Sequence, residues 1–309
     1  SLRSGALRES IAMNDLIKAR GLAKSYGGTT VLDSVDITVP AGTIVGFVGA
    51  NGAGKTCTIR ALLGLMPLDS GSVELFGEPL GAGARDEAIV RAKRRIGVVL
   101  DTCPFIGDLT VKAVGDVVKA AYPTWRAYLF EDLLQRFELN PQRKVKDLSR
   151  GMGMKLQLAC ALAHEPELLV LDEATAGLDP LARDEVLDIL RAFVTDERHG
   201  ILLSSHITTD LEKIADVVVG IDGGRILFDL EKDAITDSMG VARCRTADVE
   251  RIVNAGVVEQ GALRVLRHEH STDVLVPDRF SLARQLPDIA CDPCSIEDYL
   301  QLVLKGEPR

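Results

Sequence analysis

The stretch that decides the fold runs from Ile44 to Leu65 and reads IVGFVGANGAGKTCTIRALLGL. Its first five residues form an apolar run typical of a buried strand, and residues 56–65 carry an apolar helical face that ends before Pro67. Between them, residues 49–56 fit the pattern G-x-x-x-x-G-K-[ST]. Its glycines let successive backbone N–H groups turn toward a phosphate, and the helix N-terminus adds its positive dipole end. The stretch therefore predicts a nucleoside triphosphate site in an α/β fold.

Two side chains of this loop have chemistry of their own. Lys55 supplies a positive charge for the β- and γ-phosphates, and the Thr56 hydroxyl can bind Mg²⁺. A chance glycine-rich turn is the alternative, but the strand before it and the helix after it argue against chance. The residues expected to hold the nucleotide are Gly49, Ala50, Asn51, Gly52, Ala53, Gly54, Lys55, Thr56 and Cys57.

The composition restricts the class of protein. The chain has 309 residues, 46% of them hydrophobic and 26% charged, with a formal net charge of −9. These values are typical of a soluble globular protein, and the acidic balance argues against a general nucleic-acid binder. No apolar run approaches the roughly 18 residues of a membrane-spanning helix, so we expect any membrane role to come through a partner.

The cysteines and the first residues carry little functional signal. Six scattered cysteines suit a reducing cytosol. Cys291 and Cys294 have the C-x-x-C spacing of a metal or redox site, but without a second such pair we interpret them as incidental thiols. Residues 1–12 have no clear period and are interpreted as an expression remnant or disordered lead-in before Met13.

The remaining chain divides into regions of different pattern. Residues 16–23, 31–39 and 72–76 predict strands of an antiparallel β element beside the phosphate loop. Residues 105–165 predict an almost wholly helical insertion between strands of an α/β sheet. Residues 233–309 combine short strand and helix patterns, which predicts a small C-terminal α+β appendage.

Two apolar strand patterns end in ionisable side chains. One leads into Asp172 and Glu173, and the other leads into His206. In a phosphate-loop protein, an acid at such a place can hold Mg²⁺ and a neighbouring acid can take a proton from an attacking water. His206 is a candidate because ligands bind at the carboxyl ends of parallel strands. The alternative is an ordinary acid pair and a structural histidine.

Two further residues have both a structural and a functional interpretation. Tyr26, in a turn with Gly27 and Gly28, is either a half-exposed turn residue or a ring that stacks on a base. Ser149 is suited to cap the helix that follows it. A serine hydroxyl beside Gly151 at a helix N-terminus can also bind phosphate.

Taken in order, these motifs resemble the ATP-binding subunit of an ABC transporter over residues 16–232. The runs IGVVLDTCPFIGDLTV, LSRGM and SSHITTDLEKIAD resemble ABC-2-type exporters, with bacitracin- and lantibiotic-resistance transporters as the nearest group. The resemblance implies an ABC ATPase domain at residues 13–232. It would have a P-loop NTPase (RecA-like) core, an antiparallel β subdomain and a helical subdomain at about 105–165.

The resemblance also implies roles in catalysis. Glu173 would be the catalytic base, His206 would hold the γ-phosphate and orient the water, and Lys55 would bind the phosphates. Mg²⁺ would be held by Thr56 and, through water, by Asp172. The cofactors implied are ATP and Mg²⁺.

Other matching positions imply a head-to-tail homodimer around two ATP molecules. Tyr26 would stack on adenine, with Val31 beside it. Ser149 and Gly151 would contact the γ-phosphate of ATP held by the other copy. Asp179 would lie in the D-loop that crosses the dimer interface.

Two motifs depart from the family pattern. Asp101 stands where the family has the Q-loop glutamine; it could approach Mg²⁺ and the nucleotide, but an ionised carboxylate only accepts hydrogen bonds. The signature reads LSRGM instead of LSGGQ, which places Arg150 and Met152 at the expected interface.

The implied protein is a cytoplasmic ATPase, peripheral on the inner face of the membrane, that powers a separate ABC-2-type permease exporting a peptide antibiotic or drug. A soluble regulatory ABC ATPase is a weaker alternative because the chain has one phosphate loop and no long heptad run. A mechanotransmission complex, which moves a partner without transport, is a second alternative that the ATPase chain does not distinguish.

Overall fold

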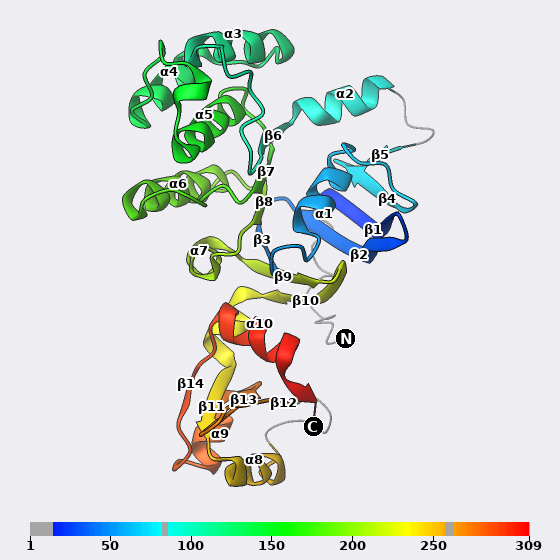
Figure 1. The fold of residues 1–309 in the computed structure, drawn as a ribbon, viewed down its shortest axis with the longest axis vertical. Helices are drawn as coiled ribbons and strands as arrows, with labels where there is room; N and C mark the ends of the chain where they lie inside the picture. Colours follow the sequence, from blue (N-terminus) through cyan, green and yellow to red (C-terminus); the bar gives the residue numbers. More distant parts are fainter. Residues whose placement is uncertain (1–14, 82–85, 257–262, 309) are drawn as a thin grey trace.

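The computed structural model describes residues 15–81, 86–256 and 263–308. The predicted lead-in at residues 1–12 lies outside this part. The described chain forms three sheets (Figure 1): a six-stranded sheet in the middle, a four-stranded sheet beside it, and a five-stranded sheet at the end that carries the C-terminus.

The central sheet explains the continuous apolar runs of the sequence. Its strand order is β10-β9-β3-β8-β7-β6, with five parallel strands and β10 antiparallel at one edge. Every residue of β3, β7 and β8 is buried, as expected for parallel strands covered on both faces. The six strands are β3 (Ile44–Val48), β6 (Ile96–Val99), β7 (Leu168–Asp172), β8 (Gly200–Ser204), β9 (Val217–Asp222) and β10 (Arg225–Glu231).

The four-stranded sheet is the predicted antiparallel element, with order β2-β1-β4-β5. Helix α1 (Lys55–Leu62) follows the phosphate loop, and its fully buried Ile59 and Leu62 belong to an apolar cluster that joins this sheet to the central one. The strands are β1 (Asp15–Tyr26), β2 (Thr29–Pro40), β4 (Ser70–Leu75) and β5 (Glu78–Leu80); β5 was not predicted.

The predicted helical insertion forms a group of helices between β6 and β7, at the opposite end of the molecule from the C-terminal sheet (Figure 1). It contains α3 (Val111–Ala121), α4 (Ala127–Arg136), the 3₁₀ helix η1 (Val145–Asp147) and α5 (Arg150–Leu162). Helix α2 (Asp86–Arg94) precedes β6. Two helices that the sequence analysis did not identify, α6 (Pro180–Phe193) and α7 (Thr208–Ile214), follow β7 and β8.

The C-terminal region is α+β, as predicted. Its antiparallel sheet has the order β14-β11-β13-β12-β15. The chain order β11-α8-β12-β13-α9-β14 and the pairing of these four strands match the ferredoxin-like βαββαβ arrangement. The elements are the π-helix η2 (Ala234–Ser238), β11 (Gly240–Cys244), η3 (Thr246–Asp248), α8 (Val249–Asn254), β12 (Arg264–Arg267), β13 (Thr272–Val276), α9 (Arg279–Gln285), β14 (Cys291–Pro293), α10 (Ile296–Lys305) and β15 (Glu307–Pro308).

Helix α10 joins this sheet to the rest of the molecule. Its Tyr299 ring packs edge-on against Phe228 of β10, with ring centroids 4.8 Å apart. The backbone N–H of Ile296 donates to the Glu212 carboxylate of α7 at 2.8 Å. One apolar cluster includes residues of the helical group, the central sheet and α10, so the C-terminal sheet is packed onto the core.

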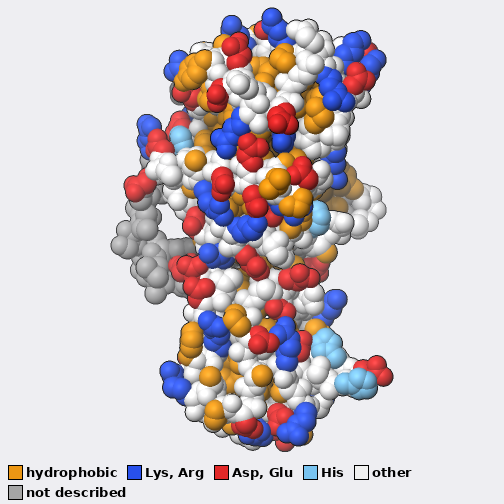
Figure 2. All heavy atoms as spheres, turned by 90° about the vertical axis from the view of Figure 1, so that its left-hand side faces the viewer, with side chains coloured by type: hydrophobic (Ala, Val, Ile, Leu, Met, Phe, Trp, Pro, Cys, Tyr) orange, Lys and Arg blue, Asp and Glu red, His pale blue; other side chains and the backbone are white. Residues whose placement is uncertain are grey.

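The surface carries both signs of charge. On the face shown in Figure 2, Lys and Arg side chains are interspersed with Asp and Glu from the helical group down to the C-terminal sheet. The mixed pattern of this face differs from the basic stripe of a general nucleic-acid binder.

Candidate active site

The loop between β3 and α1 has a backbone that requires glycine. Gly52 and Gly54 have φ values of 81° and 115°, in the left-handed region that glycine adopts readily. A Cβ added at Gly49 would lie 2.3 Å from the carbonyl oxygen of Ile221, so β9 leaves no space there for a side chain. The first N–H groups of α1 have no acceptor within the helix and are available to phosphate oxygens.

Lys55 is buried at the start of α1. Its ammonium donates to the carbonyl oxygens of Gly49 and Ala50, at 2.7 and 3.3 Å. The same nitrogen lies 3.5 Å from a carboxylate oxygen of Glu173. The loop thus holds a buried positive charge against its own backbone and against the acid that follows β7.

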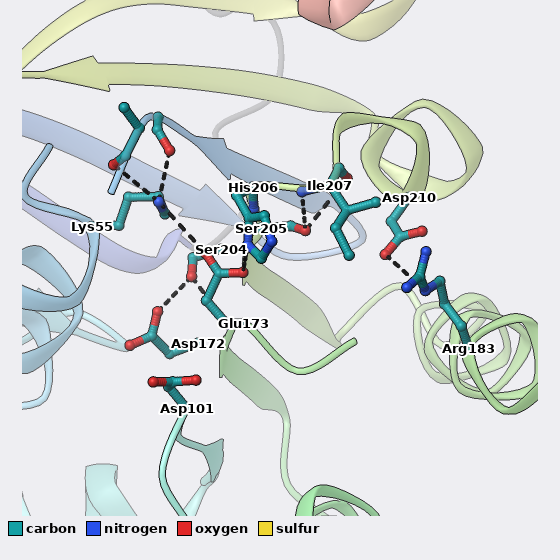
Figure 3. Close-up of polar contacts among 12 residues, drawn as sticks. Lys55, Asp101, Asp172, Glu173, Arg183, Ser204, Ser205, His206, Ile207 and Asp210 are labelled. Carbon is teal, nitrogen blue, oxygen red and sulfur yellow. Dashed lines mark hydrogen bonds and ion pairs between the residues drawn. The ribbon is translucent and has the colours of Figure 1, made fainter. Parts of the chain in front are cut away.

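Glu173 joins the loop to the end of β8. Its Oε2 lies 2.5 Å from Nδ1 of His206 and also accepts a hydrogen bond from the His206 backbone N–H at 3.3 Å. Figure 3 shows Lys55, Glu173 and His206 in one continuous chain of contacts. Glu173 has a φ of 55°, a left-handed conformation that is uncommon for a non-glycine residue.

Asp172 depends on a residue that the sequence analysis missed. The Asp172 carboxylate is 1% exposed and accepts a 2.6 Å hydrogen bond from the Ser204 hydroxyl. The Glu173 backbone N–H donates to the carbonyl and hydroxyl oxygens of Ser204, at 3.1 and 3.2 Å. Ser204 therefore supports both acids. The sequence shows Ser204 two residues before the candidate His206, which could have marked it as a site residue. Its hydrogen bond to Asp172, however, depends on β7 and β8 being neighbours.

The donor set at this edge fits Mg²⁺. The Asp172 carboxylate and the half-buried Thr56 hydroxyl offer oxygen ligands, which this hard cation prefers. Within residues 15–81, 86–256 and 263–308, no three His, Cys, Asp or Glu side chains form a group that could hold a metal ion. A site with only one or two protein ligands still fits Mg²⁺, because this cation is usually bound by one or two carboxylates together with substrate phosphates and water.

The carboxylate of Asp101 forms an ion pair with the Arg150 guanidinium. Asp101 follows β6, and Arg150 is the first residue of α5. The predicted nucleotide contact of Asp101 stays a prediction, because its described partner is this arginine.

Ser149, Gly151 and Asp179 share a surface hollow of about 230 Å³ between the N-terminal ends of α5 and α6. Ser149 caps α5 by accepting from the Met152 N–H at 3.2 Å. Asp179 caps α6 by accepting from two backbone N–H groups, at 3.1 and 3.0 Å, which lowers the pKa of its carboxyl. The structure thus brings these three predicted residues together, apart from the phosphate loop.

Tyr26 and Val31 belong to strands β1 and β2 of the antiparallel sheet. The Tyr26 side chain, at the end of β1, is 53% exposed, and the Lys24 ammonium lies 5.1 Å from its ring centroid. The carbonyl oxygen of Val31 would lie 3.2 Å from a Cβ added at Gly54. Val31 therefore lies against the phosphate loop, and Tyr26 is an exposed ring on the neighbouring strand, where it pairs with Thr29. Cys57 is half-buried and packs against the apolar cluster around α1.

Comparison with known proteins identifies the family. The model of the ABC transporter family matches residues 32–176. The bacitracin transport ATP-binding protein BcrA of Bacillus licheniformis is 35% identical over 223 residues, which cover 72% of this chain and 71% of BcrA. The chain belongs to the ABC transporter ATP-binding proteins.

Two further comparisons extend the match. The daunorubicin/doxorubicin resistance ATP-binding protein DrrA of Streptomyces peucetius is 33% identical over 277 residues, covering 87% of this chain and 82% of DrrA. The solved structure of an ATP-binding subunit of an ABC transporter superposes with a TM-score of 0.64 at 30% identity, covering 71% of this chain and 91% of that one.

The predicted ABC family and P-loop NTPase fold are thereby confirmed, and this ABC ATP-binding protein is an ATPase. The central sheet brings Lys55, Asp172, Glu173 and His206 to one edge, and their roles in catalysis stay a prediction. Among the described residues, no helix combines the length and hydropathy needed to cross a membrane.

Proposed function

We propose that this ABC ATPase hydrolyses ATP in a head-to-tail homodimer and powers a separate ABC-2-type membrane exporter. The observation that carries the proposal is the contact chain of Lys55, Glu173 and His206 beside the phosphate loop. A buried cation, a carboxylate and an imidazole converge there on the place where the loop would hold phosphates.

In this proposal Glu173 is the general base. Its carboxylate accepts a proton from the attacking water, while His206, hydrogen-bonded to that carboxylate, fixes its orientation. Lys55 and the N–H groups of the loop neutralise charge on the phosphoryl oxygens. Mg²⁺, held by Thr56 and Asp172, would supply further positive charge on those oxygens.

The geometry of Ser149, Gly151 and Asp179 favours a dimer. The hollow that they share is lined by residues of α5 and α6, of the segments that precede these two helices and of the segment that follows α4, and by no residue of the phosphate loop. A nucleotide on the loop of the same chain is therefore bound by other residues. A second copy, turned head to tail, would supply the nucleotide that Ser149 and Gly151 contact, and exposed Tyr26 would stack on adenine.

A membrane partner follows from the family and from the surface of the helical group. Ile106, Val117 and Tyr128 are 69%, 59% and 69% exposed there, which suits a docking surface for the permease. We place the protein on the cytoplasmic face of the membrane. By analogy with the names of BcrA and DrrA, the exported compound is a peptide antibiotic or drug.

Replacing Glu173 by Gln tests the proposal. The amide keeps the shape but cannot accept the proton, so ATP turnover should fall by at least about a hundredfold while ATP binding persists. The variant should accumulate as an ATP-bound dimer. A matched control is Glu165→Gln, an exposed acid whose partner is Arg126 in the helical group; it should leave turnover unchanged. Near-normal turnover of the first variant would refute the assignment.

The trapped variant also tests the transporter assignment. We would express it in the native cell, solubilise the membranes gently and identify the proteins that co-purify. A stoichiometric membrane-spanning protein is expected. Ribosomes or DNA would point to a soluble regulatory ATPase, and a membrane partner without transport activity would point to mechanotransmission.

A further inference from the structure

Asp101 and Arg150 stand at two of the positions where this chain departs from its family's motifs, and they contact each other. Asp101 replaces the Q-loop glutamine, and Arg150 replaces a glycine of the signature. Their side chains connect the segment after β6 with the N-terminus of α5, through a hydrogen bond from the guanidinium to the carboxylate.

Both partners stand on fixed backbone. The Gln157 side chain of α5 is 3% exposed and bonds both polar groups of Leu100: it accepts from the N–H at 3.0 Å and donates to the carbonyl oxygen at 3.1 Å. Leu100 directly precedes Asp101. Ser149, capping α5, directly precedes Arg150. The ion pair therefore forms between two segments whose relative position is already set by buried contacts.

The pair determines on which side of Ser149 the guanidinium lies. One surface hollow, of about 340 Å³, is lined by Asp101, Ser149 and Arg150. The other, of about 230 Å³, is lined by Ser149, Gly151 and Asp179 but not by Arg150. The ion pair with Asp101 therefore holds the Arg150 side chain in the first hollow.

Without its ion pair to Asp101, the Arg150 guanidinium would be attracted into the second hollow. The side chains of Glu138, Asp179 and Lys155 line that hollow, and the two carboxylates outnumber the one ammonium, so they would attract an unpaired guanidinium. The Arg150 side chain already passes close to it, because a Cβ added at Gly177 would lie 3.4 Å from Arg150 Cδ. Asp101 also offsets the unfavourable position of a cation at a helix N-terminus.

The pair contributes little to stability. The Asp101 and Arg150 side chains are 48% and 55% exposed, and ion pairs this exposed stabilise folded proteins only weakly. Variants of either residue are therefore expected to fold. Any large effect on activity would come from where the guanidinium lies.

We propose that Asp101 is a positioning residue that keeps Arg150 out of the hollow where Ser149 and Gly151 receive the nucleotide of the second copy. This inference rests on the proposed dimer. It differs from a direct role of Asp101 at Mg²⁺ or nucleotide. Here the weaker ATP binding of an Asp101 variant comes entirely from the Arg150 side chain, which is no longer held.

Three variants separate these two roles: Asp101→Ala, Arg150→Ala and the double variant. Loss of Asp101 alone should raise the KM for ATP about tenfold, the size of a coupling between contacting residues, with kcat within about twofold of wild type. Loss of Arg150 alone should leave KM near wild type. The double variant should recover most of the loss. In the Glu173→Gln background, light scattering would measure the ATP concentration at half-maximal dimerisation. This concentration should rank the variants in the same order as KM does.

A matched ion pair supplies the control. Arg126 and Glu165 are similarly exposed, at 51% and 47%, and lie away from both hollows, so Glu165→Ala should leave KM unchanged. The inference is overturned if Asp101→Ala behaves like wild type, or if the double variant stays as impaired as Asp101→Ala. If Glu173→Gln instead hydrolysed ATP at the wild-type rate, the proposed function would be overturned.

Discussion

Replacing Ser204 by Ala tests how the buried acid at the end of β7 is held. The Ser204 hydroxyl donates at 2.6 Å to Asp172, whose side chain is 1% exposed. A hydrogen bond to a charged group contributes about 1.5–3 kcal/mol, and the alanine methyl group provides no substitute. We therefore expect the free energy of unfolding to fall by about 2 kcal/mol. Since a residue that orients a metal ligand typically changes metal affinity 10–100-fold, the Mg²⁺ concentration for half-maximal turnover should rise about tenfold or more.

The neighbouring Ser205 is a matched control for this change. It is also fully buried, but the described contacts of its hydroxyl are with the backbone of Ile207, at 3.0 and 3.4 Å. Urea unfolding and ATP turnover at graded Mg²⁺ concentrations would be measured for both alanine variants. Ser205→Ala should lose about 1 kcal/mol with unchanged Mg²⁺ dependence. Equal Mg²⁺ dependence in the two variants would show that the Ser204 hydroxyl does not orient Asp172.

Three other substitutions test further parts of the molecule. His164 is 2% exposed, and burial lowers its pKa from 6.5 to about 4. Because the unfolded chain takes up the proton first, the free energy of unfolding of the wild type should fall by about 3 kcal/mol as the pH drops from 6.5 to 4. Urea unfolding of His164→Phe should lack this loss. Gly49→Ala would place a Cβ 2.3 Å from the Ile221 carbonyl oxygen, so calorimetry should find ATP affinity reduced at least about tenfold, with about 1–3 kcal/mol of stability lost. Tyr299→Ala removes the buried ring that packs on Phe228, so thermal unfolding should report a loss of about 3 kcal/mol.

Each of these three has an outcome that contradicts its reasoning. Identical pH dependence in wild type and His164→Phe would mean that the histidine does not titrate in this range. Wild-type ATP affinity of Gly49→Ala would mean that the loop moves away from β9 at no cost. A Tyr299→Ala variant as stable as wild type would mean that α10 does not hold the C-terminal sheet on the core.

The sequence predicted the parts of the site that depend on local pattern. An apolar strand, a glycine-rich loop and a helix place Lys55 without reference to the rest of the chain. Asp172 ends one buried strand and His206 lies two residues after another, and ligands bind at the carboxyl ends of parallel strands, so both were candidates from the sequence. Helix α6 was missed although Asp179 and Pro180 form a typical cap and first turn.

The sequence could not supply contacts between segments whose neighbours are set by the sheet order. The bond of Ser204 to Asp172 requires β8 beside β7 in the observed register. The Asp101–Arg150 pair requires α5 to pack against β6, where Gln157 fixes Leu100. The local sequence around each of these polar side chains does not indicate its partner, which is determined by tertiary packing.

The left-handed backbone at Glu173 has a consequence for the evolution of this protein. A non-glycine residue in that conformation costs about 1 kcal/mol or more, and glycine would remove the cost together with the carboxylate. Selection for turnover and selection for stability therefore oppose each other at this position. A gene copy released from the need to hydrolyse ATP should drift toward glycine or asparagine here early. The melting temperature of Glu173→Gly against Glu173→Ala measures that pressure, and equal values would mean that it is absent.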